Sequence, residues 1–201
     1  MSSRATAALF AAAWLAGCEL PSYSPDPFVE KLKSNPTDIE AMATLAIIGR
    51  PSVAPLLAAL EEGASIRKAA LTTLSVAGEP CWPAMMDYFD LGKDDEVKLD
   101  ILEVFAAHRW QGVLRKLSDR VEHPTLGSYV YNTIVRIAGA PSAPPDPWVD
   151  GKIDPAKKAE FDRWVGRQAS VMSALELRST LYGRSELEKV KKLIEEEYQR
   201  W

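Results

Sequence analysis

Apolar residues return between Thr37 and Pro141 with a period of about 30 residues, a length typical of repeat proteins. One residue in each period marks an equivalent point, and the positions one, two and four before it are apolar in every copy. The markers are Gly49, Gly78, His108 and Gly139, and the residues four positions before them are Leu45, Leu74, Val104 and Val135. A helix ending at each marker would bury this face. We therefore expect Leu45, Leu74 and Val104 to lie in one continuous core.

A second apolar stripe follows each of the first three markers. Its residues are spaced 3, 1 and 3 apart, which places them on one face of a helix. The stripes are Val53, Leu56, Leu57 and Leu60, then Trp82, Met85, Met86 and Phe89, then Trp110, Val113, Leu114 and Leu117. Gly49 and Gly78 suit helix ends, and Pro51 and Pro80 block continuation two residues later. Hairpins with one apolar face must stack on their neighbours, so the pattern predicts an all-α fold.

Further elements are predicted at both ends of the repeat. The repeat opens at Thr37-Asp38-Ile39-Glu40, a capping-box pattern. Residues 142–154 are rich in proline, which predicts a linker or a strap laid along the helices. Residues 155–201 predict two helices, the second opened by Ser185 and Glu188 in another capping box. We expect this C-terminal helical hairpin to cap the array, and a docking helix for a partner is the alternative.

Residues 1–17 have the layout of a secretory signal. A single positive charge at Arg4 precedes an apolar, alanine-rich run from Ala5 to Ala16 that contains no acidic residue. This run is shorter than the ~20 residues that a helix needs to span a bilayer. The sequence therefore predicts export without a permanent transmembrane helix.

The end of this signal, Leu15-Ala16-Gly17-Cys18, resembles the lipobox of bacterial lipoproteins. The resemblance implies cleavage between Gly17 and Cys18, a diacylglycerol on the sulfur of Cys18, and an acyl chain on the new N-terminus. Several acyl chains hold a protein on a membrane permanently. Glu19 follows the cysteine in place of the aspartate that favours the inner membrane in Gram-negative lipoproteins, which by resemblance points to the outer membrane. The alternatives are an ordinary secretion signal and a buried alanine-rich helix.

Residues 18–36 would connect the lipidated cysteine to the repeat. Pro21, Pro25 and Pro27 lie among serine and aspartate residues there, a composition typical of an extended, non-helical tether. We expect the folded part to begin at residue 37.

Residues 37–141 resemble the short bacterial type of HEAT-like repeat, first noted in phycobilisome lyases. The likeness rests on a Gly-x-Pro turn followed by a Val-x-x-Leu-Leu helix, best seen from Gly49 to Leu60. It implies a short HEAT-like α-solenoid of about 3–4 helical hairpins. Two features depart from the family pattern: His108 replaces a glycine, and Pro141 is expected to cut the fourth unit short.

The second helices of HEAT-like arrays usually line the concave side, and this resemblance implies that their exposed residues form a partner-binding surface. The charged candidates are Glu61, Asp87, Asp90, Arg115 and Lys116. Such a surface would be acidic near the first two repeats and basic at the third, and its contacts would depend on salt.

Composition narrows the function classes. The chain is 47% apolar and 26% charged, as in folded proteins, and its net charge of −4 argues against a nucleic-acid partner.

If Cys18 is acylated, Cys81 is the only thiol left and no internal disulfide forms. Cys81 and His108 fall in successive turns, but two such ligands do not make a zinc site. No catalytic spacing is recognisable, so we expect neither an enzyme nor a bound cofactor beyond the covalent lipid.

Three functions are then compatible with the sequence. The favoured one is a membrane-anchored structural or adaptor subunit that binds another envelope protein or complex. The second is a carrier of a small molecule or lipid, with a pocket between the repeats and the C-terminal helices lined by Trp82, Met85 and Met86. The third, by analogy with the repeat family, is a lyase-like activity.

Overall fold

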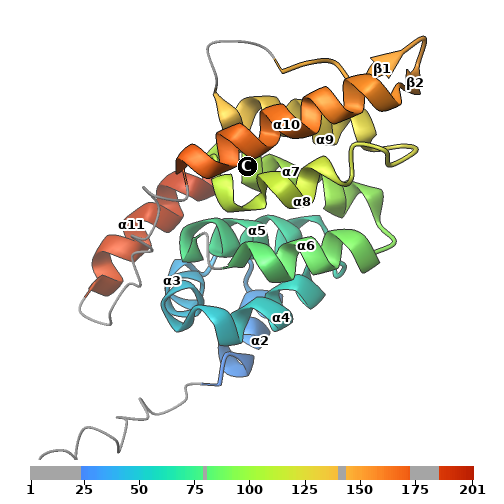
Figure 1. Ribbon diagram of the computed structural model, residues 1–201. Helices are drawn as coiled ribbons and strands as arrows, with labels where there is room; N and C mark the ends of the chain where they lie inside the picture. The colour runs from blue at the N-terminus through green and yellow to red at the C-terminus, as the bar shows by residue number, and fades with distance from the viewer. Residues whose placement is uncertain (1–23, 79–80, 140–143, 173–185) are drawn as a thin grey trace, which may run out of the picture.

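Figure 1 shows the computed structural model, which describes residues 24–78, 81–139, 144–172 and 186–201. Most of these residues are helical, and the predicted all-α class is confirmed. The helices are α2 (Asp26–Ser34), α3 (Ile39–Ile48), α4 (Arg50–Ala59), α5 (Ala64–Ala77), α6 (Trp82–Leu91), α7 (Asp95–His108), the 3-10 segment η2 (Gln111–Val113), α8 (Leu114–Ser118), α9 (Gly127–Ala138), α10 (Pro155–Met172) and α11 (Leu187–Tyr198).

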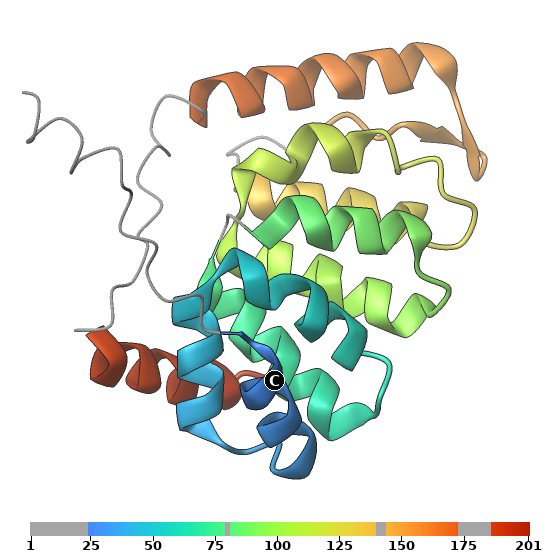
Figure 2. The ribbon, with the colours of Figure 1, turned by 90° about the horizontal axis from the view of Figure 1, so that it is seen from below.

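The helices from α3 to α10 form two layers. In the first-helix layer, α3, α5, α7 and α9 each pack against the next. In the second-helix layer, α4 packs against α6, α6 against η2, and α8 against α10. The chain alternates between the two layers. α2 packs against α3 and α4 at one end, and Figure 2 shows α10 at the other.

The predicted core is confirmed. Leu45, Leu74 and Val104 are each 0% exposed and belong to one hydrophobic cluster that runs through the array. Of the residues in the three second-helix stripes, Trp82 alone is only half-buried, and it still packs against that cluster. The spacing in the sequence therefore identified the buried faces of both layers.

Glycines end three helices of the first-helix layer, as predicted. Gly49, Gly78 and Gly139 have φ values of 72°, 91° and 53°, a region where a Cβ atom would be strained. The fourth end differs, because α7 continues through His108 and the left-handed residue is Arg109, with φ 50° and ψ 47°. The missing glycine is thus replaced by a strained arginine one residue further on.

Asp38, rather than the Thr37 that opens the predicted capping box, caps α3. Its carboxylate accepts a hydrogen bond from the backbone N–H of Ala41 at 2.8 Å. This contact satisfies one of the N–H groups that have no partner within the helix.

The non-helical tether predicted for residues 18–36 is wrong from Asp26 onward, where α2 begins. Pro25 and Pro27 lie at the start of this helix, where a proline lacks only an N–H that would have no partner. Val29 and Leu32 are buried, since α2 packs its apolar side against α3 and α4. The folded part therefore begins before residue 37.

The proline-rich stretch at 142–154 contains a small hairpin among its described residues. Strand β1 (Trp148–Val149) pairs antiparallel with β2 (Lys152–Ile153) around Asp150 and Gly151, whose φ values are 50° and 75°. An Asp-Gly pair readily adopts such a turn. The ring centroids of Trp148 and Tyr131 lie 5.3 Å apart, so the hairpin is held against α9 as a strap.

Beyond Pro141, where we expected the fourth unit to be cut short, the described chain continues into the hairpin and α10, and α10 contacts α9. Phe161 of α10 is fully buried, and its ring lies 5.6 Å from that of Tyr131 on α9. α10 also packs against α8, as the previous second helices pack against one another.

The predicted C-terminal hairpin of residues 155–201 is wrong in its packing. α11 lies against α3 and α5, whereas α10 packs against α8, and Figure 2 shows α10 and α11 apart. Each helix buries its own apolar stripe on a different surface, and Val190 and Ile194 of α11 are 0% exposed. Ser185 lies outside the described residues, and Glu186 occupies the N-cap of α11.

Candidate functional site

The predicted lipid anchor lies outside the described residues, as do Gly17, Cys18 and Glu19. In the described part of the chain, no helix is both long and apolar enough to span a bilayer.

The five charged residues predicted to bind a partner differ in whether contacts within the protein already occupy their side chains. The Asp90 carboxylate accepts two hydrogen bonds from the Arg120 guanidinium, at 2.9 and 2.6 Å. Glu61 accepts a hydrogen bond from the hydroxyl of Tyr88 at 2.6 Å. The side chains of the other three are exposed and make no ion pair with any described residue; they are Asp87, Arg115 and Lys116.

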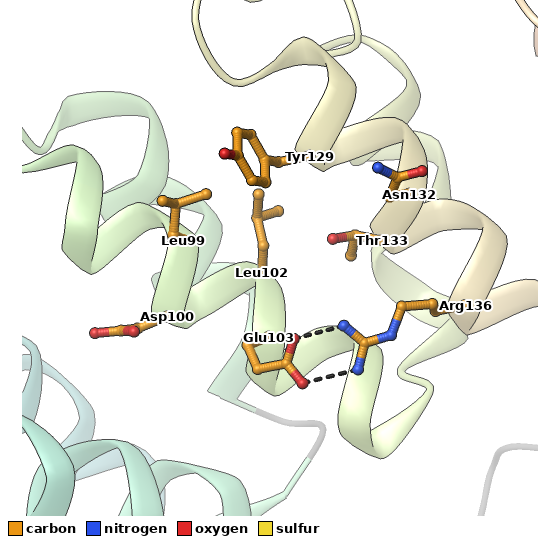
Figure 3. Close-up of a pocket in the computed structure, with 8 residues that line it drawn as sticks. All are labelled: Leu99, Asp100, Leu102, Glu103, Tyr129, Asn132, Thr133 and Arg136. Atoms are coloured by element: carbon orange, nitrogen blue, oxygen red, sulfur yellow. Dashed lines mark hydrogen bonds and ion pairs between the residues drawn. The ribbon is translucent and has the colours of Figure 1, made fainter. Parts of the chain in front are cut away.

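A pocket in the first-helix layer was not predicted from the sequence. It lies between α7 and α9, has a volume of about 320 Å³, and is called here the α7–α9 groove. Figure 3 shows its lining, which consists of Leu99, Asp100, Leu102, Glu103, Tyr129, Asn132, Thr133 and Arg136. Leu99 and Leu102 supply the apolar part, and Tyr129 is unusually exposed for an aromatic residue, at 53%.

Several polar groups of the α7–α9 groove lack partners. Within the described chain, the side chains of Tyr129, Asn132 and Thr133 make no hydrogen bond. The nearest cation to the Asp100 carboxylate is Arg67, at 3.9 Å, and that guanidinium already binds Asp94 and Glu96. Burial, opposed by Arg67, raises the pKa of the Asp100 carboxyl above its ordinary value. The side chains of Tyr129 and Asn132 are exposed at the mouth of the groove, whereas Thr133 is buried in its wall.

An ion pair closes one end of the α7–α9 groove. The guanidinium of Arg136 on α9 donates two hydrogen bonds to the Glu103 carboxylate on α7, at 2.5 and 2.7 Å (Figure 3). Hydrogen bonds from Arg136 hold the pKa of the Glu103 carboxyl below its ordinary value. This bidentate contact links the two helices that form the walls.

His108 binds Glu197 of α11 rather than pairing with Cys81. Its Nε2 atom lies 3.1 Å from the Glu197 carboxylate. Cys81 is buried, and burial raises the pKa of its thiol to about 11, so it is protonated at neutral pH. No group of three or more histidine, cysteine, aspartate or glutamate residues is positioned for a metal ion in the described part.

A second pocket, of about 500 Å³, lies between the repeats and α11, and we call it the α11 pocket. A pocket in this place was expected, but its lining was wrongly assigned. Met85 and Met86 are 0% and 3% exposed and belong to the core, and the partly buried Trp82 packs against that core. The residues that line the pocket are Ser75, Val76, Gly78, Ala107, His108, Trp110, Leu193, Glu196, Glu197 and Arg200.

The sequence carries only a weak signal of the α7–α9 groove. Tyr129, Asn132, Thr133 and Arg136 follow the helical spacing of a single polar face. Such a face is ordinarily solvated, and nothing in the sequence distinguishes it from one that borders a groove.

Comparisons with protein-family models, with curated proteins and with solved structures found no match to this chain.

Proposed function

We propose that the protein is a lipoprotein of the cell envelope that acts as a structural adaptor for another envelope protein or complex, without an enzymatic role. On this proposal the chain is cleaved after Gly17, and Cys18 carries a diacylglycerol and an N-acyl chain. The lipobox-like sequence supports the anchor, and Glu19 supports the outer membrane.

The same proposal treats the paired helices as a short HEAT-like solenoid. Three features support this: the chain alternates between two layers, the apolar positions repeat, and glycines end three of the helices in the first-helix layer. A repeat array offers long surfaces of exposed residues, which suits a protein that binds other proteins.

The α7–α9 groove is the observation that carries the adaptor proposal. It combines an apolar floor, the exposed Tyr129 ring and a half-buried Asp100 carboxylate that accepts no hydrogen bond from any described residue. Tyrosine is enriched among the residues that dominate binding energies at protein interfaces. We propose that the groove binds a segment of a partner protein that brings an apolar side chain to Leu102 and a basic side chain to Asp100.

The exposed charges of the second-helix layer form the second proposed contact. Asp87, Arg115 and Lys116 offer unpaired charges of both signs. Glu61 and Asp90 contribute less on this proposal, because contacts within the protein already occupy their carboxylates. Rim charges of this kind act mainly on association rate and salt dependence.

A carrier of small molecules is the second candidate function, and the α11 pocket favours it. Pockets of this size are typical of ligand sites, and this one lies where the repeats meet the C-terminal helix. A lyase-like activity, suggested by repeat analogy alone, is the third hypothesis.

Affinity capture from detergent-solubilised membranes tests the adaptor role. The full-length protein should retain a specific envelope protein, and crosslinks should map to α7 and α9. Tyr129→Ala should reduce the yield of that partner at least tenfold, and Asp100→Asn should reduce it to a similar extent. Leu91→Ala is the matched control, because Leu91 is 82% exposed on α6 and its loss should leave capture unchanged.

A double variant separates the contribution of the second-helix charges from that of the α7–α9 groove. Asp87→Lys with Arg115→Glu reverses the second-helix charges and should weaken capture most at low salt. The adaptor proposal is wrong if no partner is retained, or if one is retained at full yield by both the groove and the charge-reversal variants.

The anchor has its own test. Cys18→Ser should move the protein from the membrane fraction to the soluble fraction, because the acyl chains are its proposed hydrophobic anchor. An unmodified Cys18 in the intact mass of the membrane-derived protein would exclude lipidation.

A further inference from the structure

The hydroxyl of Thr133 on α9 is directed differently from those of other threonines in the described helices. Thr44, Thr72 and Thr73 each donate a hydrogen bond to the backbone carbonyl four residues earlier, at 2.7 to 2.8 Å. Thr133 is 5% exposed, yet its hydroxyl makes no such bond and has no partner among the described residues. Figure 3 shows it directed across the α7–α9 groove toward Leu102, and its oxygen keeps accessible surface there. An occupant of the groove can therefore reach this hydroxyl.

The α7–α9 groove has the length of a short extended peptide. Its α9 wall extends from Tyr129 to Arg136, which is about 10 Å at a rise of ~1.5 Å per residue. An extended chain rises ~3.3 Å per residue, so about three extended residues match this length. Figure 3 shows Tyr129 at one end, the Glu103–Arg136 pair at the other, and Thr133 between them. The Thr133 hydroxyl would therefore lie beside the main chain of such a peptide.

Asn132 lies next to Thr133, at the mouth of the groove. Its side-chain amide makes no hydrogen bond with any described residue, so its carbonyl oxygen and its NH₂ group are both free. One acceptor and one donor side by side match the N–H and C=O groups of a peptide main chain. In a helix these groups bond to one another, whereas in an extended chain they need outside partners. The pair of polar side chains therefore favours an extended occupant over a helical one.

The docking of α11 shows, by contrast, how this protein binds a helix. α11 packs against α3 and α5 and buries Val190 and Ile194, both 0% exposed. The buried Glu197 of the same helix is matched by His108, 3.1 Å away. A helix laid in the α7–α9 groove would bring no free main-chain group to Thr133.

The charge on the α7 side of the groove suits a basic side chain. The guanidinium of Arg67 lies 3.1 Å from the carboxylate of Asp94 and 3.2 Å from that of Glu96. The same guanidinium lies 3.9 Å from the Asp100 carboxylate. One positive charge does not balance three negative ones, so a negative potential remains at Asp100.

Building on the proposed role of the groove as a protein-binding site, we propose that it recognises an extended segment of about three residues through its main chain. The Asn132 amide would pair with an N–H and a C=O of the segment, and the Thr133 hydroxyl would donate to a second carbonyl. An apolar side chain would pack at Tyr129 and a basic one would lie at Asp100. Side chains two positions apart in an extended chain share a side, so one residue separates these two.

Titration of the full-length, ¹⁵N-labelled protein in detergent with two blocked tripeptides tests the proposal. The tripeptides are acetyl-Leu-Ala-Lys-amide and acetyl-Lys-Ala-Leu-amide, which cover both chain directions and are too short to form a stable helix. At least one should shift the amide signals of Asp100, Tyr129 and Thr133 saturably, with a dissociation constant in the millimolar range. N-methylation of each peptide N–H in turn should weaken binding about tenfold at one position and little at the others.

Matched variants localise the contacts. Thr133→Val keeps the shape of the side chain without its hydroxyl and should weaken binding about 2- to 10-fold. Thr72→Val removes a buried hydroxyl of α5 that does not line the groove, and should leave binding unchanged. Asp100→Asn should abolish the preference for lysine over norleucine, which has a similar chain without the charge. Circular dichroism confirms that each variant is folded.

Three outcomes would overturn main-chain recognition: no saturable shift with either tripeptide, equal effects of Thr133→Val and Thr72→Val, or affinities that do not respond to N-methylation. The adaptor proposal would survive each of them if Tyr129→Ala still reduced capture of the envelope partner. The two proposals therefore fail in different experiments.

Discussion

Leu74→Ala should destabilise the protein by about 3 to 4 kcal/mol. Leu74 is 0% exposed in the middle of the first-helix layer, so truncation removes about three buried carbon groups at ~0.8 kcal/mol each. The packed helices on either side limit collapse, and the residual cavity adds a further ~1 kcal/mol or more.

Urea unfolding followed by circular dichroism at 222 nm measures this change. The transition of Leu74→Ala should shift to a lower midpoint with an unchanged slope. Leu91→Ala is the control, since Leu91 is 82% exposed and its truncation should change stability by less than ~0.5 kcal/mol. If the two variants unfold at the same midpoint, the alignment of the repeats is wrong.

Three other predictions concern the Ser75 hydroxyl, the Cys81 thiol and the Glu103–Arg136 ion pair. Ser75→Ala should stabilise the protein by up to ~1 kcal/mol in the same urea assay, because it removes a buried hydroxyl that has no hydrogen-bond partner among the described residues. Iodoacetamide should leave Cys81 unmodified at pH 7 in the folded protein and alkylate it after unfolding, as mass spectrometry would show. The Glu103–Arg136 pair should add less than ~1 kcal/mol at neutral pH. Because the folded pKa of Glu103 is depressed, acid titration of stability should lose this contribution as the pH falls through that pKa, and Arg136→Met should remove the loss.

The buried faces of the repeat were predictable because residues that pack on one face of a helix must recur at helical spacing in the sequence. Leu56 and Leu114 lie in equivalent stripes of different units, and both are 0% exposed. The helix ends were also predictable where glycine marks them. His108 was the expected end marker of α7, but the left-handed residue lies one position later. Arg109 adopts the conformation that a glycine would normally take.

Other elements were missed for identifiable reasons. α2 was hidden by prolines that its first turn tolerates. The hairpin at residues 148–153 had an Asp150-Gly151 signal, but its strands are too short to show alternation. The surface against which α11 packs could not be predicted. The sequence of an amphipathic helix shows which of its faces is buried, but not which other helices will cover that face.

The candidate sites were less predictable than the fold. Tyr129 and Asp100 lie on separate helices of the α7–α9 groove, and only the packing of α7 against α9 makes them neighbours. Glu197 meets His108 across 89 positions of sequence. Sequence spacing predicts contacts within a helix or between adjacent repeats. The contacts described here depend instead on which helices pack together in the folded chain.

The return of α11 to α3 and α5 has a consequence for how the chain folds. In an open repeat array each unit rests only on its neighbours, so folding can spread from any point and a truncated array can persist. Here the last helix completes the burial of the first ones, which raises the contact order and ties both ends into one cooperative transition. While a ribosome still retains α11, the first helices of the emerging chain expose the apolar face that α11 will cover. We therefore expect such a nascent chain to remain accessible to chaperones and proteases until α11 emerges.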